Sequence, residues 1–208
     1  LTISSAKEKN IENIHANKKN NILTVGKVLS GNPDLISQCS EHNVSGSLQT
    51  SYVEHAYIEP EAGTSWMDGD TLVIQACTQA PIMDRDDTAN ILGLKKEKVR
   101  IIPATAGGGF GSKLDVSIQP LLGLVTLKTN KPCRIVFTRN ESMMSTTKRH
   151  PADMNASISA TKNGKIIGMI FDGDFNTGAY ASRGPTVATR VPIHASGPYY
   201  TPNYKALG

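Results

Sequence analysis

The chain has 208 residues and a formal net charge of +4, and 38% of its residues are hydrophobic against 19% charged. This composition is typical of a globular protein with a modest core, formed by one domain or by one domain plus a fragment. The 22 basic residues are spread along the chain without a dense basic block interleaved with aromatic residues, which argues against a nucleic-acid-binding surface.

Residues 1–20 are polar and rich in Asn and Lys, and they predict a helix end followed by a loose connector. After them, alternating or β-branched runs bounded by Gly, Asn and Pro predict strands. The predicted strands cover residues 22–29, 45–52, 71–76, 99–103, 133–138, 152–161 and 165–176. Asn163-Gly164, between the last two, is typical of a two-residue hairpin turn.

Helices are predicted less often than strands. Residues 80–94 have Pro in a first turn, acidic residues early and Gly93 as a stop. Residues 116–132 have a broad apolar face, with Pro120 in the first turn. Residues 182–195 are ambiguous, because two prolines flank a possible short helix. Since strands and helices alternate without the rhythm of a doubly wound sheet, we expect an α+β fold with mixed and antiparallel sheets.

The most unusual stretch is ATAGGGFGSKLD, residues 104–115, in which three consecutive glycines are costly to order on folding. It fails the Walker pattern, because Ser112 precedes Lys113 and Leu114 follows it, and it fails the dinucleotide fingerprint by one residue. The loop follows a predicted strand and enters a predicted helix, so its amides could bind an anion. A tight connection that uses glycine only for positive φ explains the loop equally well.

At this loop the sequence resembles the molybdenum-binding subunit of the xanthine dehydrogenase/aldehyde oxidase family, whose loop reads Gly-Gly-Gly-Phe-Gly-x-Lys. Other segments resemble the family in order and at the expected spacing over about residues 20–208. They are VEHAYIEPEAG, TQAPIMDRDDTANILGLKKEKVRII, NKPCRIVFTRNESMMSTTKRHPADM and GAYASRGPTVATRVPIHASGPYYTPNY. The resemblance implies that residues 21–208 form the first part of a molybdenum cofactor-binding domain, with residues 1–20 as a connector.

The same resemblance implies a chemistry. Family members carry molybdenum on a molybdopterin, here expected in the cytosine dinucleotide form, and hydroxylate a carbon of an N-heterocycle or an aldehyde with oxygen from water. Electrons leave through 2Fe-2S clusters and often FAD, on other domains or subunits. The catalytic glutamate of the family lies beyond residue 208, so we expect the isolated chain to be an inactive fragment that needs the remainder of the molybdenum domain as a partner.

Carried onto this sequence, the family loop places Gly108, Gly109, Phe110 and Gly111 at the cofactor, with the Phe110 backbone near the molybdenum. Arg190, in TRVPIH, matches an arginine that clamps substrate in purine-oxidising members.

Two positions depart from the purine-oxidising members. Val53 stands where they have a Gln directly before the Glu-His pair, and Leu114 stands where they have a substrate-binding Glu after the loop Lys. Asp115, one place on, would need a shift of register to substitute. These departures weaken a specific xanthine assignment. They also favour an alternative in which the chain is a non-catalytic anion-binding, nucleotide-binding or assembly module of the same fold.

Other candidate residues give weaker signals. Cys39, Cys77 and Cys133 are odd in number and far apart, so neither a disulfide framework nor a zinc site is predicted. His150 is interpreted as a structural residue, because Pro151 fixes the start of a strand. No apolar run approaches the ~20 residues of a membrane-spanning helix and no signal-peptide pattern is present, so we expect a cytoplasmic protein without a membrane segment.

Overall fold

The computed structural model describes residues 2–8, 11–38 and 41–208. The chain divides into two compact units, one made of residues 1–52 with 150–208 and the other of residues 53–149. Each unit contains one sheet with helices, and the sheets combine antiparallel with parallel pairing. The predicted α+β class with mixed sheets is therefore confirmed.

The first unit is built on a five-stranded sheet in the order β1-β9-β8-β7-β2. Its strands are β1 (Lys27–Ser30), β2 (His42–Thr50), β7 (Ala152–Ala160), β8 (Ile166–Phe175) and β9 (Asn203–Leu207). β8 and β9 are parallel, whereas the other neighbours are antiparallel. Short helical segments of this unit are α1 (Ile3–Ala6), η1 (Lys19–Asn21) and α2 (Leu35–Gln38).

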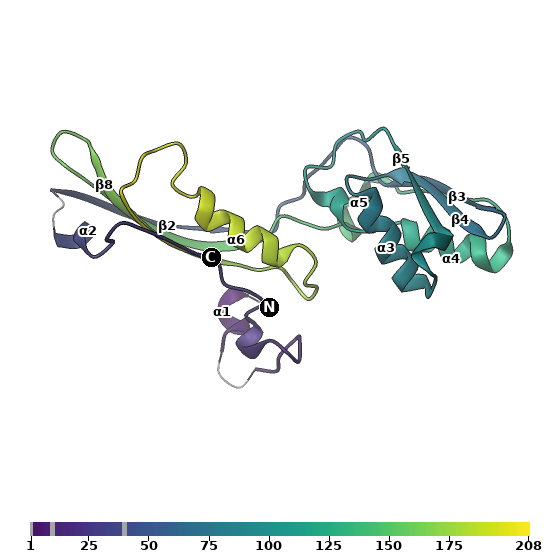
Figure 1. Ribbon diagram of the computed structural model, residues 1–208, viewed down its shortest axis with the longest axis horizontal. Coiled ribbons are helices and arrows are strands. Elements are labelled where there is room, and N and C mark those ends of the chain that lie inside the picture. Colours follow the sequence, from purple (N-terminus) through teal and green to yellow (C-terminus); the bar gives the residue numbers. More distant parts are fainter. Residues whose placement is uncertain (1, 9–10, 39–40) are drawn as a thin grey trace. The chain divides into compact units, whose positions relative to one another are not determined.

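The ambiguous segment before β9 is a helix, α6 (Gly184–His194), which lies along the sheet in Figure 1. Pro185 fits in its first turn, where an amide has no helical partner, and Pro192 lies inside the helix. The Tyr204 hydroxyl donates to the Pro192 carbonyl at 2.6 Å and so joins the helix to β9. The core of this unit is apolar packing between the helix and the central strands around Phe171 and Ala206.

The hairpin between β7 and β8 forms where Asn163-Gly164 predicts it, but its loop has three residues. Thr161 N donates to Lys165 O, and Gly164 N donates to Thr161 O. Gly164 alone of the pair has a positive φ, 79°. The loop is therefore a turn closed by a left-handed glycine, and the predicted two-residue turn is wrong.

The second unit has a four-stranded sheet in the order β5-β4-β3-β6, in which only β4 and β5 are parallel. Its strands are β3 (Ala62–Asp68), β4 (Thr71–Cys77), β5 (Val99–Ala104) and β6 (Cys133–Val136). Its helical segments are α3 (Pro81–Leu92), η2 (Lys96–Lys98), η3 (Ser112–Leu114), α4 (Gln119–Thr129) and α5 (Arg139–Ser145). α3 and α4 pack on the sheet and on each other, over a core centred on Ile74 and Leu122.

Helices α3 and α4 confirm two predictions, including the stop of α3 at left-handed Gly93 with φ 67°. β3, β9 and α5 were not predicted. The expected strand at residues 22–29 is wrong over its first half, since β1 begins at Lys27. The expected strand at 133–138 is too long, because Thr138 caps α5. No helix in the described ranges has the length and apolar character required to cross a bilayer.

Candidate functional site

The glycine-rich loop joins β5 to η3 in the second unit. Three of its residues have positive φ: Gly108 at 98°, Phe110 at 54° and Gly111 at 98°. Ser112 N donates to Gly109 O at 2.9 Å, which closes a turn with Phe110 and Gly111 at its centre. Positive φ at both central positions is the geometry of a type I′ turn, unusual for a bulky residue such as Phe.

The loop does not lead directly into a long helix, which corrects one expectation. η3 follows it, and α4 begins only at Gln119. The loop amides therefore do not stand at the N-terminus of α4. The contribution that the α4 terminus would make to an anion site is therefore absent, and only the loop's own amides remain as donors.

The inner side of the loop packs so closely on neighbouring side chains that it has no space for a Cβ atom. A Cβ built on any of three successive glycines would lie under 3.0 Å from a side-chain atom of an earlier segment. Gly107 faces Glu59 at 2.6 Å, Gly108 faces Tyr57 at 2.9 Å, and Gly109 faces Oε1 of Gln79. Packing within the unit thus requires glycine at positions 107 and 108, whereas a side chain at position 109 would displace the end of Gln79.

Gln79 holds the far side of the turn. Its Oε1 accepts from Gly111 N at 3.0 Å and from Lys113 N at 3.3 Å. Its own backbone N donates to Lys113 O at 2.9 Å. One side chain therefore bonds the loop on both sides of Ser112. Gln79 lies in TQAP, within a segment that resembles the family, but the sequence did not predict a role for it.

Glu59 and Lys113 hold the base of the loop. Lys113 Nζ lies 2.8 Å from Glu59 Oε2 and 2.9 Å from Glu59 O, and 4.5 Å from the centre of the Tyr57 ring. Glu59 Oε2 also accepts from Gly107 N at 2.8 Å. The lysine that follows the glycines therefore points inward and holds the loop to residues 57–59.

The pKa values of this pair reflect their contact. Burial opposes the charge of Lys113, but the hydrogen bond to Glu59, together with interactions with Cys77 and the negative charge of Glu59, outweighs it, and the pKa of Lys113 is raised. Burial likewise opposes the charge of Glu59, yet the hydrogen bonds from Lys113 and Gly107 lower its pKa. Both groups are charged at neutral pH.

The outer side of the loop has a different character. The Phe110 side chain is 74% exposed although its backbone is left-handed. A Cβ on Gly111 would meet no atom within 4 Å. Across the part of the chain that the structure describes, the amides of Gly108, Gly109 and Phe110 donate to no protein acceptor. The outer face thus offers a bare backbone and one aromatic ring.

The other residues predicted for the site lie in different places. Leu114 is half-buried in η3, and Val53 is 47% exposed and pairs through its backbone with Arg149. Arg190 is exposed on α6, in the first unit. Among the described carboxylates, none lies within ion-pair distance of the Arg190 guanidinium.

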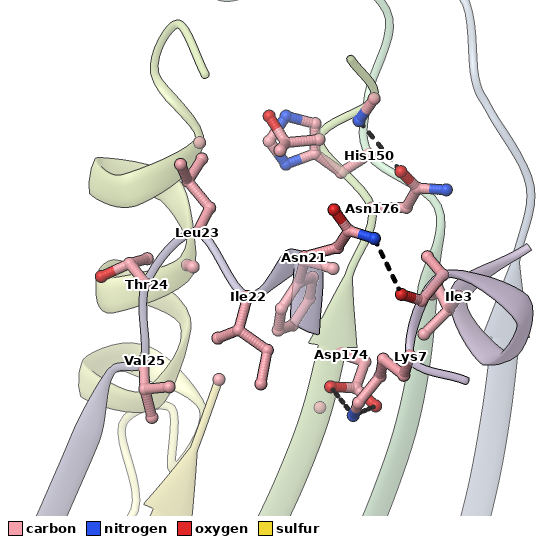
Figure 2. A pocket seen from close by; sticks show the side chains of 18 of the residues that line it. Ile3, Lys7, Asn21, Ile22, Leu23, Thr24, Val25, His150, Asp174 and Asn176 are labelled. Carbon is pink, nitrogen blue, oxygen red and sulfur yellow. Dashed lines mark hydrogen bonds and ion pairs between the residues drawn. The ribbon is translucent and has the colours of Figure 1, made fainter. Parts of the chain in front are cut away.

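A cavity of about 270 Å³ lies in the first unit. Figure 2 shows the Lys7–Asp174 ion pair at one end of it and His150 at the other, with Ile22 and Leu23 on its wall. Burial lowers the pKa of His150, so its imidazole is neutral at neutral pH. The lining of this cavity is mainly apolar. Unlike the glycine loop, the described lining contains no run of consecutive glycines.

No metal-binding cluster of three or more His, Cys, Asp or Glu occurs within residues 2–8, 11–38 and 41–208. Cys77 and Cys133 are free thiols, and Cys39 lies outside the described residues.

Two curated relatives are subunits of dehydrogenases. A nicotinate dehydrogenase large molybdopterin subunit from Eubacterium barkeri is 40% identical over 206 residues, which are 99% of this chain and 48% of that protein. A probable xanthine dehydrogenase subunit from Bacillus subtilis is 37% identical over 155 residues, 74% of this chain and 21% of that protein. The chain therefore spans at most about half the length of these relatives.

Solved structures give the same fold. The aldehyde oxidoreductase from Desulfovibrio gigas matches 99% of this chain and 23% of its own with a TM-score of 0.91, at 22% sequence identity. A Cu,Mo-CO dehydrogenase matches the whole chain and 28% of its own with a TM-score of 0.80, at 21% identity. The family model described as "Molybdopterin cofactor-binding domain" matches residues 14–208. This chain belongs to the molybdopterin cofactor-binding domain family.

Proposed function

We propose that the chain forms the first part of the molybdenum portion of a hydroxylase that oxidises a ring carbon of an N-heterocycle, with oxygen from water. The glycine loop, residues 107–111, is one wall of the cofactor site. The chain works with a separate segment or subunit that supplies the catalytic glutamate, and with iron–sulfur and flavin partners. We place this assembly in the cytoplasm.

The observation that carries the proposal is the state of Phe110. Left-handed backbone costs a bulky residue about 1 kcal/mol or more, and an aromatic ring left in water gives no packing energy in return. Phe110 has both features, with φ 54° and a side chain 74% exposed. Such strain persists only where the surroundings impose it, and it concentrates at functional sites.

The residues present fit a molybdopterin cofactor. The amides of Gly108, Gly109 and Phe110 donate to no acceptor among the described residues, and bare glycine backbone permits close approach of a ligand. A bound molybdenum cofactor would supply the redox chemistry, in which oxygen from water is added to the substrate carbon and an electron pair is removed from it. The chain's own part is to present amide donors and to place the Phe110 backbone and ring at the reacting space. We propose the cytosine dinucleotide form of the cofactor.

The proposed substrate class follows from the residues that match the family's substrate-contacting positions in the sequence. Val53 and Leu114 have no hydrogen-bonding side chain, so neither can replace the polar groups that recognise purines. Arg190 carries a guanidinium fork, which suits a carboxylate or an anionic ring oxygen. The relative that is 40% identical is named for nicotinate, a pyridine carboxylate. A pyridine-type carboxylate is therefore our first choice of substrate, with aldehydes as the runner-up.

The test is turnover by the full natural protein purified with its partners, in isotopically labelled water. We expect nicotinate or a close analogue to be hydroxylated with label in the product, at a higher kcat/KM than xanthine or a simple aldehyde. Faster turnover of xanthine than of every pyridine would overturn the substrate class. A folded complex that hydroxylates none of them would support the alternative, a non-catalytic module of the same fold.

A further inference from the structure

We propose that Gln79 is a positioning residue, which fixes the Phe110–Gly111 turn in the geometry that the cofactor meets. The inference rests on the proposed function for the identity of the ligand. The proposal has a structural part, which is that Gln79 determines the conformation of the turn. This structural part depends only on the geometry of the second unit.

Gln79 is attached to a rigid base. It lies in the short connection between β4, which ends at Cys77, and α3, which begins at Pro81. Thr78 Oγ1 accepts from Ala80 N at 2.9 Å and so bridges the residues on either side of Gln79. The backbone of Gln79 is therefore fixed by its neighbours, and only the side-chain rotamers remain to be ordered when the side chain bonds the loop.

The glycine loop is anchored on both sides of the Phe110–Gly111 turn, by Glu59 at Gly107 and by Thr147 at Ser112, but neither anchor bonds the amide of Gly111. A run of glycines has the largest conformational freedom of any sequence, and few side chains are present to pack it. Gln79 Oε1 restrains the loop by accepting hydrogen bonds from the backbone amides of Gly111 and Lys113. The same oxygen also fills the space beside the Gly109 backbone. Within the described residues, no other side chain accepts a hydrogen bond from a backbone amide between Gly108 and Lys113.

The contribution of Gln79 is separable from that of the Glu59–Lys113 pair. Glu59 bonds the amide of Gly107, before the turn, and the Lys113 ammonium. Gln79 bonds the amides after Phe110. Loss of Gln79 should therefore release the Phe110–Gly111 turn while the base of the loop stays attached.

Three variants of the full natural protein test this. Gln79→Leu keeps the size of the side chain and removes its acceptor oxygen, whereas Gln79→Glu keeps an acceptor at the same reach. Gln75→Leu, at an exposed position of β4, is the matched control. Hydrogen exchange at the amides of Gly111 and Lys113 reports the turn, and molybdenum content together with the electron paramagnetic resonance signal of the reduced metal reports the site.

We expect Gln79→Leu to speed exchange of both amides by roughly tenfold or more, as loss of a hydrogen bond implies. We expect the same variant to lower molybdenum content and alter the resonance signal, while Gln79→Glu and Gln75→Leu resemble wild type in exchange. Hydrogen exchange at wild-type rates in Gln79→Leu would overturn the claim that Gln79 determines the conformation of the turn. Faster exchange with unchanged metal content and signal would overturn the positioning role. A wild-type protein without molybdenum would refute the proposed function, and the exchange result would still decide whether Gln79 fixes the turn.

Discussion

Lys113 and Glu59 form an ion pair at 2.8 Å in which the lysine side chain is only 3% exposed and the glutamate 28%. The lysine therefore acts within the protein. It joins the strand-to-helix loop to the segment that precedes β3, and so keeps the glycine loop against residues 57–59.

Removing one member of this pair should destabilise the protein. Lys113→Met leaves the Glu59 carboxylate without its counter-ion in a largely buried place. We expect a loss of about 3 kcal/mol, at the lower end for a buried pair because Glu59 retains some exposure. The double variant Glu59→Gln/Lys113→Met should recover a large part of the loss. Urea unfolding, followed by a signal from the second unit, measures the free energy of unfolding of both variants. A double variant that is no more stable than Lys113→Met would contradict the explanation.

Asp84, in α3, gives a pH dependence with a defined sign. Its side chain is fully buried, accepts from Gln119 Nε2 at 3.0 Å, and burial raises its pKa from an ordinary 3.8 to about 6. The folded state therefore binds the proton more tightly than the unfolded state. Between about pH 4 and pH 6 this group makes stability fall as pH rises, and the loss remains above pH 6.

Asp84→Asn removes that titration while it keeps an oxygen for Gln119. We expect the variant to be more stable at pH 7, by about 3 kcal/mol at most, and to lose the decline between about pH 4 and pH 6. Unfolding midpoints across that interval are the measurement. An unchanged decline in the variant would show that another group is responsible.

Phe110 should matter for function and hardly at all for folding. Asn tolerates left-handed backbone, so Phe110→Asn keeps the turn and removes the exposed ring. We expect stability within about 1 kcal/mol of wild type. Turnover of the full enzyme should fall at least tenfold. Tyr200→Asn, which removes another side chain that is 82% exposed, is the control and should leave turnover unchanged. Equal turnover in the two variants would show that Phe110 has no role in the proposed site.

Arg190 should discriminate between substrates. Arg190→Lys keeps the charge and loses the planar fork, so it should raise KM for a pyridine carboxylate by roughly tenfold or more and affect a simple aldehyde little. Arg134→Lys, at an exposed position of β6, is the matched control. Equal losses on both substrates would mean that Arg190 does not bind the anionic group.

Much of the fold could be predicted because its signals are local. α3 has Pro81 at its start and Gly93 at its end, and β4 is a run of buried β-branched and apolar residues. The start of α5 is also marked in the sequence, although the prediction did not include this helix. Thr138 and Glu141 form a capping box, but the β-branched run before them extended the predicted strand across the cap.

Other elements depend on partners distant in the sequence. β9 is parallel to β8 and antiparallel to β1, and its short sequence becomes a strand through these two pairings. β3 is central in its sheet although Gly63 and Ser65 have low strand propensity, because it pairs on both edges and Ser65 bonds α4.

The candidate site also combines features that the local sequence predicts with features that depend on distant segments. The glycine run identified the loop, and its departure from the phosphate-binding patterns excluded two classes of ligand site. The reason for three glycines was not visible, because Tyr57, Glu59 and Gln79 reach them from earlier segments. A resemblance in TQAP and EHAYIEPE pointed to these residues, but their packing against the loop required the fold.

The most direct test of the account is the molybdenum and pterin content of the full natural protein, purified with its partners. We expect stoichiometric molybdenum with a molybdopterin, and loss of both when Gly108 is replaced by Val, since a side chain there clashes with Tyr57 and displaces the loop that forms the wall of the site. A folded, intact natural complex without molybdenum or pterin would contradict it.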